Sequence, residues 1–255
     1  MSAQDIKPLN IWQSLILVLI PGGTAALIIH FLIPPFIERT NTPFLYAYLP
    51  WWIFFMLVYF IASFVAYKLE GNVFTLSKFA HRYRLHRIRG REWFWFFALL
   101  ITFAIALAGL GIWGDELSSL PALSMPTVFP AELDPSNPEG RVPGEFMGVA
   151  LKGQWWIVVV YFLGWVLNIF GEEFWFRGYM LPRQENAYGK WAWSLHGLVW
   201  TLNHLFQVWT LVILFPYAFL WSYIIQRGRN TWIPIIAHGT ANLVPLIVII
   251  IGVIG

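Results

Sequence analysis

The stretch NIFGEEFWFRGYM, residues 168–180, places two adjacent glutamates and an arginine inside an apolar, aromatic run. A charged side chain at the centre of a bilayer costs about 2.5–3.5 kcal/mol on insertion scales, so such residues usually mark a functional site. The rest of the sequence decides whether this run lies in a membrane and what offsets the charges of Glu172, Glu173 and Arg177.

Composition indicates a membrane protein. Of the 255 residues, 58% are hydrophobic and 11% are charged, whereas a soluble domain carries about 25% charged residues. The chain has no cysteine, which excludes disulfides and Cys-ligated zinc. The net charge of +3 is too small to indicate nucleic acid, and we expect none as a partner. We expect an all-α, polytopic transmembrane bundle in contact with the lipid bilayer.

Apolar runs of about 20 residues are candidate spans, and the chain has about seven, with six to eight as the range. The first run exceeds 20 residues and lacks a small-x-small cleavage site, so we expect a span and no cleaved signal. A tight turn near Val208–Thr210 must separate the fifth span from the sixth. The expected spans are 11–33, 45–67, 93–113, 154–176, 191–209, 211–226 and 231–254.

Two connections differ in charge. Loop 68–92 has seven basic and two acidic residues, which predicts a cytoplasmic loop and a cytoplasmic N-terminus. Its simplest role is to orient the bundle and attract anionic lipids. Connection 114–153 is acidic and has six prolines between Pro121 and Pro143, so we expect an irregular lid or linker. Glu139 and Arg141 belong to this connection.

Buried polar residues concentrate in the second half of the chain. We therefore divide the chain into N-terminal spans, 1–153, and a core that carries the site, 154–255. His30 stands alone in the first span, and we expect a satisfied or interfacial side chain there. His196 is either an ordinary polar contact or an outer supporting residue of the site. The remaining polar residues of the expected spans are Asn168, Asn203, His204, His238 and Asn242.

Helical spacing separates the two glutamates. Glu173 precedes Arg177 by four residues, the favourable order for an ion pair, and this pair alone could serve only to fix topology. Glu172 lies about 100° further round the helix, so we expect its partner to come from another span. Trp200 and His204 also lie four apart. So do His238 and Asn242, which alone could form a clasp between helices.

Three motifs in order resemble the CAAX protease and bacteriocin-processing (Abi) family of type II CAAX prenyl endopeptidase-like proteins. EEFWFR, 172–177, matches its diglutamate–arginine motif. WTLNH, 200–204, is similar to its second motif, with Trp200 in place of the more common Phe. NTWIPIIAHGTANL, 230–243, is similar to its third, with His four residues before Asn.

The resemblance implies an intramembrane endopeptidase that acts on a membrane-bound protein or peptide, with a prenylated CAAX-type substrate as one option. Glu172 would activate water, His204 would help hold it, and His238 and Asn242 would donate to the oxyanion. Glu173, Arg177 and Trp200 would support these four residues.

The family is often labelled metalloprotease, so the cofactor stays open between zinc and none. Two histidines and a glutamate are an accepted zinc set, here Glu172, His204 and His238. The helical H-E-x-x-H signature is absent from the sequence. Because Glu172 lies near the inner end of its expected span, we expect a cavity that opens on the cytoplasmic side.

Two other functions compete with proteolysis. One is a non-catalytic bacteriocin-immunity or scaffold protein. The other is a proton-coupled transporter, for which broken helices repeated in two halves would be the cue, and the sequence has no internal repeat. The compact chain without cysteine is compatible with a prokaryotic inner membrane, which is the expected location.

Overall fold

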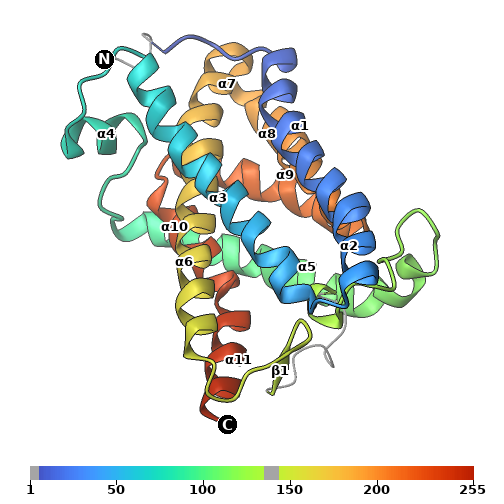
Figure 1. Cartoon of the computed structure of the whole chain (residues 1–255). Coiled ribbons are helices and arrows are strands. Elements are labelled where there is room, and N and C mark those ends of the chain that lie inside the picture. The colour runs from blue at the N-terminus through green and yellow to red at the C-terminus, as the bar shows by residue number, and fades with distance from the viewer. Residues whose placement is uncertain (1–5, 135–143) are drawn as a thin grey trace.

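The chain folds into an all-α bundle with one short hairpin (Figure 1), as predicted; the computed structural model describes residues 6–134 and 144–255. The first half contains α1 (Ile11–Leu27), η2 (Ile28–Leu32), α2 (Ile33–Thr40), α3 (Phe44–Leu69), α4 (Leu76–Arg82), η3 (Gly90–Glu92), α5 (Trp93–Ser118) and η4 (Ala131–Leu133). Strands β1 (Glu145–Phe146) and β2 (Val149–Ala150) pair antiparallel. The second half contains α6 (Trp155–Glu172), η6 (Glu173–Met180), α7 (Leu181–Tyr188), η7 (Gly189–Trp191), α8 (Ala192–Asn203), η8 (Leu205–Thr210), α9 (Leu211–Gly228), α10 (Trp232–Ala241) and α11 (Leu243–Ile254).

The number of spans is somewhat lower than the seven expected. Within residues 6–134 and 144–255, five helical segments are long and apolar enough to cross a membrane, or six if a bent pair counts as one. The expected fourth and fifth spans fall in a single segment, Trp155–Asn203. Its last helix, α8, has 12 residues, or about 18 Å at ~1.5 Å per residue, short of a hydrocarbon core of about 30 Å.

Two breaks shape the last spans. The turn expected near Val208–Thr210 is present but begins at His204, and Gln207 has a non-helical backbone (φ −121°, ψ 58°). The last expected span, 231–254, is not one straight helix: α10 and α11 are bent by 42° at Asn242. Both breaks fall at polar residues, which other protein groups must surround at membrane depth.

Glycines bring neighbouring helices into contact. A Cβ atom on Gly171 would lie 2.7 Å from the Met56 carbonyl oxygen, so α3 and α6 meet at this point. A Cβ atom on Gly197 would lie 2.8 Å from the Phe219 Cα, at the contact of α8 with α9. Small residues of this kind let helix backbones approach closely in membranes.

The basic loop is tied to the end of α3 and to α7 by ion pairs. Glu70, directly after α3, accepts from Arg82 Nε at 2.8 Å and from Arg183 Nη2 at 2.8 Å. Arg84 Nη2 lies 2.5 Å from Glu185 Oε2 on α7. This end of the bundle therefore contains a connected network of charges.

The Glu70 network predicts loss of stability in acid. Burial opposes the charge of Glu70, but hydrogen bonds and charges from Arg82 and Arg183 outweigh it and lower the pKa of Glu70. The stabilisation is complete above the unfolded pKa of about 4.3 and is lost as the pH falls through the lower folded value. We expect the unfolding temperature in detergent to fall between pH 5 and pH 3, and to fall less for Glu70→Gln. Identical pH profiles for the two proteins would contradict this.

The connection after α5 packs against the opposite end of α3. Leu45 N–H donates to the Met147 carbonyl at 3.0 Å, and Trp209 Nε1 donates to the Leu133 carbonyl at 3.1 Å. Phe129 stacks on His30 with ring centroids 5.9 Å apart, so His30 is packed among aromatic rings. Of the expected irregular lid or linker, the described part contains η4 and the β1–β2 hairpin, whereas Pro135, Pro138, Glu139, Arg141 and Pro143 lie outside the described residues.

Candidate active site

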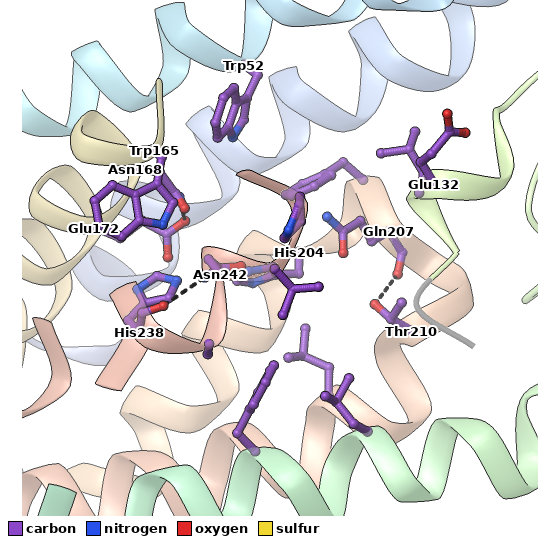
Figure 2. Close-up of a pocket in the computed structure, with 18 of the residues that line it drawn as sticks. Trp52, Glu132, Trp165, Asn168, Glu172, His204, Gln207, Thr210, His238 and Asn242 are labelled. Carbon is purple, nitrogen blue, oxygen red and sulfur yellow. Dashed lines mark hydrogen bonds between the residues drawn. The ribbon is translucent and has the colours of Figure 1, made fainter. Parts of the chain in front are cut away.

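The four residues expected to react line one cavity of about 390 Å³ (Figure 2): Glu172, His204, His238 and Asn242. They come from the end of α6, from the break between α8 and η8, from α10, and from the bend between α10 and α11. Three of the four sit where a helix ends, so each break in the helices exposes a polar group to the cavity. Residues more than 60 positions apart in the chain thus meet at one place.

Glu172 is buried, and its carboxylate has partners on two helices. Asn168, four residues earlier on α6, donates from Nδ2 to Oε1 at 3.0 Å. Trp200 on α8 donates from Nε1 to Oε2 at 3.4 Å. The expectation that Glu172 lacks a partner on its own helix is therefore wrong, because Asn168 lies one turn before it.

Glu173 has two positively polarised partners. Arg177 Nη1 lies 3.3 Å from Glu173 Oε1, and both side chains are fully buried, in agreement with the predicted ion pair. His238 Nδ1 lies 2.9 Å from the same oxygen. The histidine of α10 thus bonds the second glutamate and not the first.

A π-helix begins directly after Glu172. Residues Glu173–Met180 form η6, directly after Glu172 ends α6. Hydrogen bonds from i to i+5 widen the turn, and such turns occur often at functional sites. The Arg177 guanidinium lies 4.3 Å from the Trp200 ring centroid, so the aromatic face covers the buried charge.

The hydrogen bonds of the two cavity histidines fix their tautomers. His204 Nδ1 lies 2.8 Å from the Trp200 carbonyl oxygen, which can only accept, so Nδ1 carries the hydrogen. His238 Nδ1 likewise donates to the Glu173 carboxylate. In both rings Nε2 is the nitrogen left for other chemistry. Asn242 Nδ2 donates to the His238 carbonyl at 3.3 Å and has a second hydrogen.

His196 lies apart from these groups. Its Nδ1 contacts Gln184 Oε1 at 2.8 Å, and Gln184 donates to Ser14 Oγ at 3.1 Å. All three residues are fully buried, and none of them lines the cavity. The polar-contact interpretation of His196 fits this position.

The cavity extends away from the basic loop. Tyr48, Trp52 and Met56, from the first part of α3, line it, whereas the basic loop follows the last residue of that 26-residue helix. Glu132 and Met147 complete the far end, where Glu132 Oε1 accepts from Met147 N–H at 2.6 Å. The expected opening toward the basic loop is therefore wrong: the side chains just beyond Glu172 in η6 are buried, and the space lies on the other side.

The sequence analysis missed several cavity residues. Trp52, Trp165 and Glu132 lie around the space with Gln207 and Thr210 (Figure 2). Aromatic residues are too abundant in this chain for any one to stand out. One feature of the sequence could have indicated Glu132: it lies in the long Pro-rich connection that was expected to form a lid or linker.

One comparison with known proteins bears on this site. Residues 154–244 match the family model described as "Type II CAAX prenyl endopeptidase Rce1-like". This segment, called the matched segment below, is similar to that family. Neither the curated proteins nor the solved structures contain a match to the chain.

The matched segment contains all four of the candidate reactive residues. The apolar helices make the chain an integral, multi-pass membrane protein. Its matched segment is similar to a family of CAAX-type membrane proteases. Part of the cavity wall comes from outside the matched segment: from α3, α5, the connection that contains Glu132, and α11.

The zinc set suggested by the sequence is Glu172, His204 and His238, and the cofactor stays open between zinc and none. Among the described residues, no three His, Asp or Glu side chains form a group that could hold a metal ion. His238 Nδ1 lies 2.9 Å from Glu173 Oε1, which leaves Nε2 as the nitrogen that could bind a ligand.

Proposed function

We propose that the chain is an intramembrane endopeptidase that hydrolyses a peptide bond of a membrane-associated protein with water activated by Glu172. The observation that supports this most is the convergence of Glu172, His204, His238 and Asn242 on one cavity. Its walls are otherwise mainly apolar and aromatic, including Phe103, Leu107, Leu214 and Val248. A polar end and apolar walls suit a peptide attached to a lipid-embedded group.

The first step is attack by water. A water molecule between Glu172 and His204 Nε2 would give its proton to the Glu172 carboxylate while its oxygen bonds to the substrate carbonyl carbon. The Asn168 and Trp200 hydrogen bonds hold the carboxylate in place for this transfer. Burial excludes bulk water, so the aligned groups act without competition from solvent.

The developing oxyanion would accept hydrogen bonds from Asn242 and His238. Asn242 Nδ2 has a hydrogen to donate, and His238 donates from Nε2 when its ring is protonated. The Glu173 carboxylate accepts the Nδ1 hydrogen of His238 at 2.9 Å and so orients the ring. The C–N bond then breaks, and the leaving amine takes the proton held by Glu172.

The proposal also covers the class of substrate and the orientation of the chain in the membrane. The family description names prenyl endopeptidases, and the apolar walls offer room for an isoprenoid-modified residue, so we include prenylated CAAX-type proteins among the substrates. The excess of basic residues in loop 68–92 supports a cytoplasmic loop and N-terminus. A prokaryotic inner membrane is the proposed location.

Proteolysis is tested by the termini of membrane proteins in an expressing host. We expect cleavage products with the wild-type chain, and at least about 100-fold less product with His204→Gln, because a water-positioning group is lost. His30→Gln is the matched control, since His30 is also a histidine of the spans but does not line the cavity.

The control should produce the wild-type products. Product lost equally in both variants would mean that the fold, and not the site, is being disturbed. Termini that do not differ between wild type and His204→Gln would favour the non-catalytic immunity or scaffold function.

A further inference from the structure

A second pocket, of about 410 Å³, lies at the basic end of the bundle and shares no residue with the cavity. It is lined by Glu185, Gly189, Lys190, Gln226, Arg227 and Arg229. These residues belong to the end of α7, to η7, and to the end of α9. The proposed chemistry of the cavity does not use this pocket.

The accessible charge of the pocket is positive. Its one carboxylate, Glu185, is 7% exposed and already pairs with Arg84 at 2.5 Å. Arg229 lies 3.6 Å from Glu185, but its side chain is 70% exposed, and Lys190 and Arg227 are also exposed. Three cations therefore face one small pocket without an equal number of anions.

The frame of the pocket is fixed by hydrogen bonds. Gln226 donates from Nε2 to the Gly189 carbonyl at 2.9 Å, and its Oε1 accepts from Trp193 N–H at 2.8 Å. One side chain thus ties the last turn of α9 to the start of α8. The three cations project from a rigid support and not from a free loop.

An aromatic stripe leads away from the pocket along the outer face of α9. Phe215, Phe219, Tyr223 and Arg227 follow one another at intervals of four, so they share one helix face. The Arg227 guanidinium lies 5.2 Å from the Tyr223 ring centroid, and Phe215 and Phe219 are 4.6 Å apart.

Trp191 and Trp193 extend the same aromatic surface beside the pocket. Their ring centroids lie 6.4 Å apart, and Trp193 contacts Tyr223 at 5.6 Å. Lys190 Nζ lies 5.6 Å from the Trp191 ring centroid. Aromatic residues gather at the level of lipid headgroups, where one part of the ring meets water and the other meets hydrocarbon.

We propose that this pocket binds the phosphate-bearing headgroup of an anionic glycerophospholipid, with an acyl chain along the aromatic stripe of α9. Lys190, Arg227 and Arg229 would contact the phosphate, since basic pockets between membrane helices bind such headgroups. The stripe favours a lipid over a soluble anion, because a free phosphate has no apolar part that could contact Phe215 and Phe219. An apolar surface that begins at a cationic pocket matches the two parts of a phospholipid.

The test is native mass spectrometry of the full-length protein in neutral detergent, with phosphatidylglycerol and phosphatidylcholine of equal acyl chains. We expect wild type to retain phosphatidylglycerol selectively. The variant Lys190→Gln/Arg227→Gln/Arg229→Asn should bind it on the order of 100-fold more weakly, since each basic residue near a headgroup contributes about fivefold. Asn is chosen at 229 because Arg229 has φ +51°, a conformation that Asn tolerates.

The matched control is Arg87→Gln/Arg89→Gln/Arg91→Gln, which removes the same charge from exposed positions of the basic loop. It should keep the wild-type preference. Equal weakening in both triple variants would overturn a specific site, as would equal retention of the two lipids by wild type. Displacement of phosphatidylglycerol by soluble glycerol phosphate at equal concentration would overturn the assignment to a lipid.

A single variant keeps the proposal testable if the triple variant does not fold. Arg227 is exposed and contacts the Tyr223 ring, so Arg227→Gln should fold. It is expected to weaken phosphatidylglycerol binding about fivefold. Unchanged binding in a folded Arg227→Gln protein would contradict the proposed site.

Discussion

Glu172→Gln is expected to yield a folded protein whose peptidase activity is lower by about 10³-fold, within the ~10²–10⁴ range of general acid–base catalysis. Gln has the shape of Glu but cannot take the proton from water. It can still accept the Asn168 hydrogen bond that Glu172 Oε1 accepts at 3.0 Å. The contact with Trp200 is longer, at 3.4 Å, and its loss should change stability little.

Two measurements on the same purified protein separate these effects. Cleavage of a membrane-anchored peptide gives the activity, and thermal unfolding in detergent gives the stability. Glu38→Gln, on the exposed part of α2, is the control for removing one negative charge. Activity of Glu172→Gln within tenfold of wild type would contradict its role as the base.

Glu173→Gln is expected to lower the free energy of unfolding by about 3–5 kcal/mol, the usual cost of breaking a buried ion pair from one side. The Arg177 charge would stay fully buried beside a neutral amide, where Glu173 now lies at 3.3 Å. His238 would also lose the carboxylate that accepts its Nδ1 hydrogen at 2.9 Å. We therefore expect a loss of activity even in the fraction that folds.

The double variant Glu173→Gln/Arg177→Met distinguishes the two roles of Glu173. It removes both charges and replaces them with side chains of similar length, so most of the lost stability should return. Activity should not return, because a neutral amide still replaces the charged carboxylate that accepts the His238 Nδ1 hydrogen. A single variant as stable as wild type, or an active double variant, would contradict this account.

Much of the architecture could be predicted from the sequence because membrane spans leave a strong apolar pattern. The all-α bundle, the ion pair of Glu173 with Arg177, and the turn between α8 and α9 follow from composition and spacing. The bend at Asn242 could not be predicted in the same way. An apolar run of 24 residues, 231–254, gives no sign of where α10 ends and α11 begins.

The partners of the two glutamates were less predictable. A rotation of 100° per residue describes a regular α-helix, and it gives no sign that the π-helix η6 begins at Glu173. The sequence places Asn168 four residues before Glu172. Whether the two side chains form a hydrogen bond depends on their rotamers, which the spacing does not fix. The position of the cavity depends on how connection 114–153 folds back, which no periodic pattern encodes.

Among its contacts, the Trp200 side chain reaches three polar residues. The Arg177 guanidinium lies 4.3 Å from its ring centroid, the His204 ring centroid lies 5.2 Å away, and its N–H donates to Glu172 at 3.4 Å. A phenylalanine, the more common residue in the resembling motif, would offer a ring but no N–H. Exchange between the two residues is therefore not neutral in this chain. Replacement of Trp200 by Phe would require a second substitution that supplies another donor to Glu172. In related sequences, Phe at position 200 should therefore occur together with a donor side chain elsewhere beside Glu172.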